Sequence, residues 1–208
     1  MIIKWIGHAC FKIEEDDFSV ILDPYADGMV PGLKPVREEA CMVFSSHQHD
    51  DHNATENITL INFCESQKIK TEIIHTYHDE AKGSKRGPND ITILYTGDER
   101  IAHLGDLGCE LEEEQKEKLK GLDALLIPIG GHYTIDSDEA HKLIEEIKPR
   151  IVIPMHYRDK GFGFDVISTK DRFIELEGKA TQLEESFMDT KTQFPTRTVF
   201  LKPENEKR

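Results

Sequence analysis

The sequence lacks the features that mark several large classes of protein. No apolar run approaches the roughly 20 residues that a membrane-spanning helix needs. Only four cysteines occur, none in a C-x-x-C pair, so we expect reduced thiols rather than a disulfide framework. Met1 to Trp5 enter an apolar strand pattern and show no signal-peptide plan. These absences predict a single cytoplasmic domain over residues 1–208, with no membrane partner.

Positive charge is also scarce. The chain has 26 lysine and arginine residues against 40 aspartate and glutamate residues, which gives a formal net charge of −14. Nucleic-acid binding normally requires lysine and arginine side chains that displace counterions, and the sequence shows no basic stripe. The charge therefore favours a small-molecule substrate over a nucleic acid, and gives no signal of an oligomeric state.

Short apolar segments separated by turn residues predict a strand-rich chain. The first of these segments are Ile2 to Ile6, Cys10 to Ile13 and Phe18 to Leu22. Later strands are predicted over 57–63, 71–77, 91–95, 100–104, 122–129, 151–155 and 197–201, and helices over 110–120, 136–147 and from 168. Asp136 and Glu139 form a capping box for the second helix. Strands that first meander and later alternate with helices predict two sheets with helices outside, a layered α/β arrangement.

The densest group of potential metal ligands is the hexapeptide His47 to His52, which reads H-x-H-x-D-H. It follows the apolar run Cys41 to Phe44, which indicates a buried strand that ends in a loop. Alternate residues of such a turn can point to one side, so that the first two histidines would bind one cation while Asp51 and His52 face its neighbour. Histidine and carboxylate suit zinc, iron or manganese. Histidines that only pack or face solvent are the alternative, and the interposed aspartate argues against it.

Three later strand ends offer further ligands. His75 and His78 point to opposite sides of a strand, so only one of them faces the site, and spacing alone does not choose between them. Asp106 follows a strand that ends at a glycine, where its carboxylate would either bridge two cations or cap the next turn. His156 stands alone at the end of an apolar strand, where a structural role is the more common one.

Taken together, these segments resemble the metallo-β-lactamase-fold hydrolases, particularly the small stand-alone members grouped with ascorbate-6-phosphate lactonase. The matching segments occur in the family's order across residues 1–160 or so. They are Gly7-His8, Leu22-Asp23-Pro24, His47 to His52, His78-Asp79, His103 to Asp106 and Pro154 to Tyr157. The resemblance implies an αββα sandwich, although this family commonly has a helix where residues 57–63 predict a strand.

The resemblance also implies two divalent metal ions, with zinc as the first choice and manganese or iron as alternatives. The implied ligands are His47, His49 and His78 for the first ion, Asp51, His52 and His156 for the second, and Asp106 as a bridge between both. This set selects His78 over His75.

Two residues are predicted to be catalytic at such a site. Two metal ions about 3.5–4 Å apart lower the pKa of a shared water and polarise the substrate. Asp51 can orient the resulting hydroxide and receive its proton. His132, in the segment Gly130 to Thr134, can contact the substrate or donate to a developing oxyanion. Tyr133 is an alternative for that role, and an exposed turn without a catalytic function is another.

Several other residues have two possible roles. His8, Asp23 and His103 either hold ligand histidines in position or are structural. The segment Gly161 to Phe164 either forms a wall of the pocket or packs into the core. Lys85-Arg86 either binds an anionic group of the substrate or lies in a solvated loop.

The function that these patterns favour is a metal-dependent hydrolase of a small ester, lactone or phosphoester. One alternative is a phosphodiesterase or nuclease on the same fold, which the acidic charge opposes. Another is an iron-dependent redox enzyme, which His49 opposes because di-iron members typically have glutamate at that position. A metal-binding module without catalysis is the non-enzymatic alternative.

Overall fold

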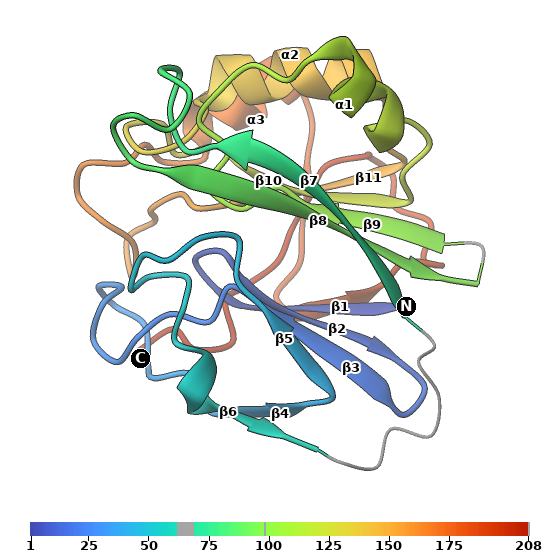
Figure 1. The fold of residues 1–208 in the computed structure, drawn as a ribbon. Helices are drawn as coiled ribbons and strands as arrows, with labels where there is room; N and C mark the ends of the chain where they lie inside the picture. Colours follow the sequence, from blue (N-terminus) through green and yellow to red (C-terminus); the bar gives the residue numbers. More distant parts are fainter. Residues whose placement is uncertain (62–68, 98, 208) are drawn as a thin grey trace.

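Two five-stranded sheets pack face to face in a computed structural model that describes residues 1–61, 69–97 and 99–207 (Figure 1). The first sheet contains β1 (Ile2–Gly7), β2 (Cys10–Glu15), β3 (Phe18–Leu22), β5 (Met42–Phe44) and β13 (Phe187–Asp189), in the order β13-β1-β2-β3-β5. The second contains β7 (Lys70–Tyr77), β8 (Pro88–Thr96), β9 (Glu99–His103), β10 (Ala124–Pro128) and β11 (Ile151–Met155), in the order β11-β10-β9-β8-β7. The predicted meander of the first residues is therefore confirmed.

Strand direction in the first sheet places three loops at one edge. β1, β2 and β3 pair antiparallel, whereas β5 joins β3 in parallel, with Leu22 opposite Phe44. The carboxyl ends of β1, β3 and β5 consequently share one edge of the sheet. The residues that leave this edge are His8, Asp23 and the segment that begins at Ser45.

The second sheet repeats this arrangement. β9, β10 and β11 are parallel, and because β8 is antiparallel to both β9 and β7, β7 runs in the same direction as these three. β10 and β11 are buried throughout, as expected for parallel strands that are covered on both faces. The four carboxyl ends deliver His78, Asp106, Gly130 and His156 to a common edge.

Helices cover the outer face of the second sheet, which confirms the layered α/β arrangement (Figure 1). They are α1 (Glu113–Leu119), α2 (Ser137–Ile147) and α3 (Asp171–Glu177). α2 begins with the predicted capping box, in which the Glu139 amide donates to Asp136 Oδ1 and the Asp136 amide to Glu139 Oε2, both at 2.9 Å. Its apolar face, including Leu143 and Ile147, packs toward the sheet.

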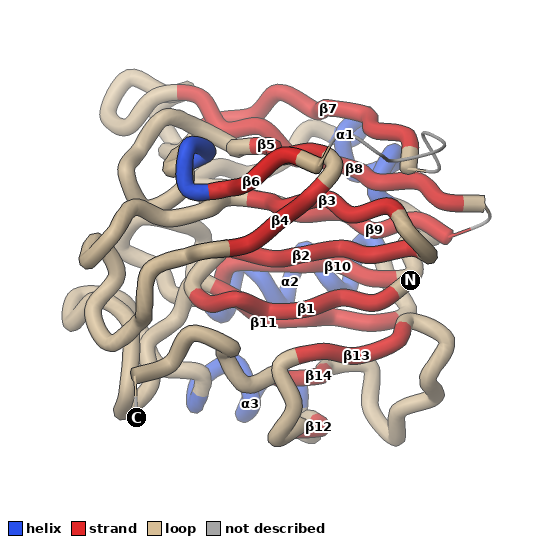
Figure 2. The backbone as a smooth tube through the Cα atoms, turned by 90° about the horizontal axis from the view of Figure 1, so that it is seen from below, coloured by secondary structure: helices blue, strands red, loops and turns tan. Residues whose placement is uncertain are grey.

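The outer face of the first sheet carries a different layer. β4 (Glu38–Ala40) and β6 (Ile58–Leu60) form a parallel pair that lies across it (Figure 2). A 3-10 turn at Thr55–Asn57 directly precedes β6. The strand predicted over 57–63 is confirmed for Ile58–Leu60, while residues 62 and 63 lie outside the described ranges. A last two-stranded sheet pairs β12 (Thr181–Gln182) with β14 (Val199–Phe200).

The cysteines follow the prediction only in part. Cys10 and Cys109 are free thiols, the first buried and the second half-buried. Cys41, however, is disulfide-bonded, so the expectation of reduced thiols is wrong at that position. No helix in the described ranges is both long and apolar enough to span a membrane.

Candidate metal centre

The two edges that carry these strand ends face each other and bring the predicted ligands together. In the first group, the rings of His47, His49 and His78 lie with centroids 4.6–5.1 Å apart, and their potential ligand atoms lie within 4.8 Å of one another. His47 and His78 are buried, and His49 is exposed. The competing His75 lies outside this group, 84% exposed at its side chain and 2.7 Å from Asp90.

The second group contains one residue more than predicted. His8, Asp51, His52 and His156 place their potential ligand atoms within 4.8 Å of one another. The His8 ring lies 4.1 Å from that of His156, and His8 Nε2 is 3.4 Å from Asp51 Oδ2. His8 was a candidate for a supporting or structural role, and the structure places it among the ligand atoms themselves. The one signal in the sequence was its position directly after a short strand that ends in glycine.

Asp106 lies between the two groups. Its Oδ1 is 3.2 Å from His52 Nε2, and its Oδ2 is 3.4 Å from His78 Nε2 and 3.2 Å from His156 Nε2. Asn89 holds the backbone there, because its Oδ1 accepts from the Asp106 amide at 2.8 Å. One buried carboxylate thus faces histidines of both groups.

Buried atoms without hydrogen-bond partners mark this region. In the part of the chain that the structure describes they include Nε2 of His47 and His52, Nδ1 of His78, both ring nitrogens of His8 and His156, and Asp106 Oδ1. Buried polar atoms are almost always satisfied in folded proteins. A converging set of imidazole nitrogens and carboxylate oxygens fits bound divalent cations such as zinc, manganese or iron.

The ionisation states also suit metal binding. Burial, together with the neighbouring His156, lowers the pKa of His8 to about 4, and burial lowers that of His47 to about 3, so both rings are neutral near pH 7. Burial alone would raise the pKa of Asp106, but His156 and His52 hold it well below its usual value. Burial alone would lower the pKa of His52, but Asp106 and Asp23 raise it, so this ring has to release a proton when a metal binds. Neutral imidazoles and ionised carboxylates are the forms that ligate metals, and His8, His47 and Asp106 already have them.

Asp23 positions the histidines from behind. Its Oδ2 lies 2.7 Å from His52 Nδ1 and accepts from Ser46 Oγ at 2.6 Å, and Ser46 Oγ in turn contacts His47 Nδ1 at 2.9 Å. Such partners fix the orientation of ligand histidines. His103 is instead structural, because its Nδ1 accepts from the Gly105 amide and its Nε2 donates to Ala9 O.

Backbone strain is concentrated at these strand ends. His8, Asp23 and His156 have φ values of 56°, 48° and 52°, in the left-handed region. This region is unfavourable for residues with a Cβ atom and costs about 1–3 kcal/mol at each position. Such strain is found mainly at functional sites, where the surrounding structure fixes the side chain in a useful direction.

A pocket of about 370 Å³ opens beside both groups. Its lining includes Asp51, His78 and Asp106 from the ligand groups, together with Arg86, Tyr133 and Phe164. Phe164 therefore belongs to the pocket wall, whereas Phe162 is buried against Trp5 and Tyr157. Of the two alternatives for the segment Gly161 to Phe164, the pocket wall applies to Phe164 and packing into the core applies to Phe162.

The catalytic role of His132 stays a prediction, because the structure places this residue beside the pocket and not in its lining. This residue is exposed, with φ at 59°, and lies outside the pocket lining, which contains its neighbour Tyr133. The His132 ring packs edge-on against Tyr133 at 4.5 Å, and its carbonyl accepts from Arg86 Nη2 at 3.0 Å. The left-handed turn directs the tyrosine, and not the histidine, toward the pocket.

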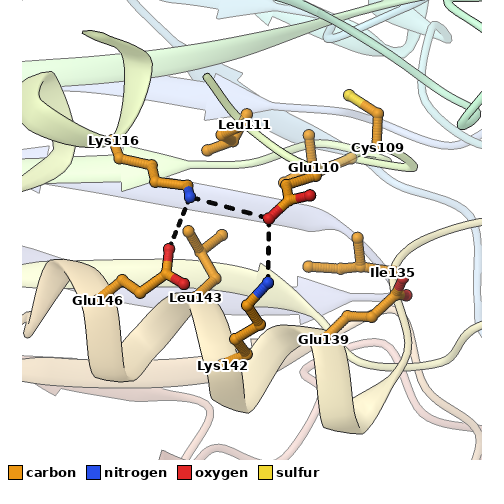
Figure 3. Close-up of a pocket in the computed structure, with 10 residues that line it drawn as sticks. Cys109, Glu110, Leu111, Lys116, Ile135, Glu139, Lys142, Leu143 and Glu146 are labelled. Carbon is orange, nitrogen blue, oxygen red and sulfur yellow. Dashed lines mark hydrogen bonds and ion pairs between the residues drawn. The ribbon is translucent and has the colours of Figure 1, made fainter. Parts of the chain in front are cut away.

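A second cavity, of about 120 Å³, lies on the helical side of the molecule (Figure 3). Its charged side chains pair with one another: Lys116 with Glu146 at 2.8 Å and Lys142 with Glu110 at 3.0 Å. Leu111 and Leu143 supply its apolar wall. The cavity has the composition of a packed helix boundary with satisfied charges.

Comparisons with known proteins agree with this geometry. A family model described as a β-lactamase superfamily domain matches residues 2–156. A UPF0173 metal-dependent hydrolase of Desulforamulus reducens is 29% identical over 194 residues, which cover 76% of this chain and 84% of the relative. A UPF0173 protein of Pyrococcus abyssi is 33% identical over 189 residues, which cover 78% and 86%.

A solved structure from Thermotoga maritima, described as a hydrolase of the metallo-β-lactamase superfamily, has a TM-score of 0.74 at 27% identity. The match covers 96% of this chain and 97% of the other. The predicted resemblance to stand-alone metallo-β-lactamase-fold hydrolases, and the sandwich fold that it implied, are thereby confirmed. The chain belongs to the β-lactamase superfamily.

Proposed function

We propose that this member of the superfamily is a hydrolase that uses two divalent metal ions, zinc first and manganese or iron as alternatives, on a small ester, lactone or phosphoester. One observation carries the proposal. The Asp106 carboxylate lies 3.2–3.4 Å from nitrogens of His52, His78 and His156, and so faces both groups of buried imidazoles. A shared carboxylate between two sets of nitrogen ligands is the arrangement that a dinuclear hydrolase requires.

In this proposal the chain holds the metals with the ligands named above. The first ion would be held by His47, His49 and His78, and the second by Asp51, His52 and His156 with His8 beside them. Asp106 would be shared between the two. Ions bound in this way lower the pKa of a water molecule and polarise a carbonyl or phosphoryl oxygen.

The side chains at the pocket supply the remaining steps. Asp51 lines the pocket, where its carboxylate would orient the attacking water and its Oδ2 would receive the proton. His8 Nε2 lies 3.4 Å from this oxygen, so the His8 ring borders the same part of the site. The Phe164 ring, 5.4 Å from that of His8, shields this side of the site from bulk water.

Elemental analysis of the purified protein, followed by a screen of lactones, phosphodiesters and thioesters, tests the proposal. We expect close to two ions per chain, and at least about a 100-fold loss of turnover with weaker metal retention in Asp106→Ala, since loss of a mere supporting residue already costs about 10–100-fold. His75→Ala is the matched control, because His75 also pairs with an aspartate but lies outside both groups. Full activity in Asp106→Ala would end the proposal.

The phosphodiesterase or nuclease alternative has less support, because the formal charge of −14 opposes a polyanionic substrate. Retention of RNA or DNA at physiological salt would favour it. The cytoplasmic location stays a prediction, and the disulfide at Cys41 counts against it because cytosolic thiols are usually kept reduced.

A further inference from the structure

The pocket beside the candidate metal groups contains one cationic side chain whose role the hydrolytic chemistry does not explain. We propose that Arg86 binds a negatively charged oxygen group of the substrate, away from the bond that is cleaved, while Tyr133 and Phe164 pack against the apolar body of the same molecule. This inference rests on the proposed hydrolase function and adds the class of substrate: a small ester or lactone that carries a carboxylate or phosphate on an apolar or aromatic body.

The loop that carries Arg86 is built to hold a fixed shape. Asp79 Oδ1 accepts from the amides of Ala81 and Gly83 at 2.9 and 3.1 Å, and its Oδ2 from those of Lys85 and Arg86 at 3.0 and 2.7 Å. Because Asp79 directly follows His78, the loop fixes the arginine relative to the first ligand group.

The Arg86 guanidinium lies beside the Tyr133 ring in the pocket lining. Its Nη2 donates to His132 O at 3.0 Å, and its Cζ lies 5.7 Å from the centre of the Tyr133 ring, within the range of a cation–π contact. In the described ranges no carboxylate approaches it within 4.0 Å, whereas the adjacent Lys85 pairs with Glu80. In a chain with 40 acidic and 26 basic residues, an unpaired arginine in a pocket is available for an anionic ligand.

The other pocket residues define what accompanies the anionic group. The Phe164 ring stands edge-on to Tyr133 at 6.3 Å and to His8 at 5.4 Å, so the aromatic wall joins the arginine to the ligand groups. A pocket of about 370 Å³ accommodates a small molecule. The planar guanidinium binds carboxylate and phosphate oxygens in pairs, which a lysine at this position would not do.

Paired aryl esters test this inference on the metal-loaded protein. The probes are 4-nitrophenyl acetate, which is neutral, and mono-4-nitrophenyl succinate, which carries a carboxylate. We expect Arg86→Gln to lower the preference for the charged ester, expressed as the ratio of kcat/KM values, by about 10-fold to 100-fold, in keeping with the value of a charged hydrogen-bond pair. Most of the change should appear in KM. Arg86→Lys should recover part of it.

Lys85→Gln is the matched control, because Lys85 is the adjacent cation on the same loop but lies outside the pocket lining and is paired. It should leave the ester ratio unchanged. An Arg86→Gln protein that hydrolyses both esters with an unaltered ratio would overturn the inference and leave the proposed function intact.

Direct binding separates the two proposals further. Phenylphosphonate and its neutral relative benzyl alcohol are titrated by calorimetry into the metal-loaded wild-type and Arg86→Gln proteins. We expect about a 10-fold or greater weakening for phenylphosphonate alone. Failure of the wild-type protein to hydrolyse any ester would count against the proposed function, while the binding comparison still decides the role of Arg86. Equal phenylphosphonate affinity in both proteins would refute it.

Discussion

Buried ionisable groups have hydrogen-bond partners on the helix-covered face of the second sheet, but many of those at the edge where its strands end do not. On the helical side, Lys116 is only 10% exposed at its side chain and lies 2.8 Å from a carboxylate oxygen of Glu146 (Figure 3). Glu113 is also 3.0 Å away. Glu177, 1% exposed, accepts from Arg197 and Thr198 and contacts His141 at 2.7 Å. At the strand ends, by contrast, imidazole nitrogens and Asp106 Oδ1 are buried without hydrogen-bond partners in the described chain.

This difference separates a structural cluster from a binding site. A buried charge that already has its partners is complete in the protein alone, and its removal affects folding. A buried group without a partner costs about 1–3 kcal/mol unless a ligand satisfies it. The helical clusters should therefore respond to pH and mutation through stability alone, and the strand-end groups through metal.

Metal removal should have the largest effect and act on the strand-end groups only. Free metal 1,000-fold above its Kd stabilises the folded state by about 4 kcal/mol, because it binds the folded chain alone. A chelator should abolish this increment in denaturant unfolding of the wild-type protein. Glu146→Gln, on the helical side, should lose as much as the wild type on chelation, whereas Asp106→Ala should lose much less. If a chelator leaves the unfolding curve of the wild type unchanged, the strand-end groups do not bind metal and their contrast with the helical clusters is lost.

Replacing Glu177 should have the next largest effect and leave metal binding intact. Glu177→Ala deprives Arg197, Thr198 and His141 of their shared acceptor. Leaving the buried Thr198 hydroxyl without this acceptor costs about 1–3 kcal/mol. Urea unfolding of wild type and variant at pH 7, with elemental analysis of both, measures the two quantities. Loss of metal from a stable variant would contradict the separation.

The difference in unfolding free energy between wild type and Glu177→Ala should depend on pH, and the sign of this dependence follows from the pKa of Glu177. Burial alone would raise the pKa of Glu177, but Arg197, Thr198 and His141 lower it below its usual 4.5. The folded state thus binds fewer protons than the unfolded state in acid, so this contribution is complete above pH 4.5 and is lost as pH falls through the folded-state pKa. The gap between wild type and Glu177→Ala should narrow in that acidic range, and a constant gap would show that the carboxylate's charge is unimportant.

The sequence predicts those features of the fold and the site that depend on residues close together in the chain. The capping box at Asp136 and the hexapeptide His47 to His52 act within one segment, so their spacing alone predicts them. The selection of His78 over His75 came from family resemblance. The structure confirms that the two side chains point apart, since His75 contacts Asp90 on the neighbouring strand β8.

Signals that depend on distant partners were missed. β13 forms because the edge of β1 offers a pairing surface, with Ile3 opposite Met188, and no local pattern indicates this. His8 joins the second ligand group through a tight turn that aims its side chain across to the other sheet. Spacing left His132 and Tyr133 as alternatives for a similar reason, because the backbone of one left-handed residue decides which of the two lines the pocket.

His8→Asn tests whether this unpredicted residue belongs with the unsatisfied groups, with a smaller expected effect. Asparagine tolerates the left-handed backbone at this position better than most residues, so the turn is retained. We expect the affinity for the more weakly held metal ion to fall by about 10-fold, or about 1.4 kcal/mol, as for loss of a residue that supports a ligand. Metal competition titrations measure it. Cobalt-substituted protein adds a second readout, because a changed ligand set alters its visible spectrum, and identical spectra and affinities would return His8 to a structural role.

The smallest effect should come from the helical cluster around Lys116. Glu146→Gln removes one of the carboxylates within 4.0 Å of this ammonium, and Glu113 and Glu110 remain. Because the charge keeps partners, the loss should resemble that of a partly exposed pair, below about 1 kcal/mol in denaturant unfolding. Metal content and turnover should not change, since no residue of this cluster belongs to either ligand group. A stability loss of several kcal/mol would mean that the cluster depends on a single pair, and the helical side would then be as intolerant of a missing partner as the strand ends.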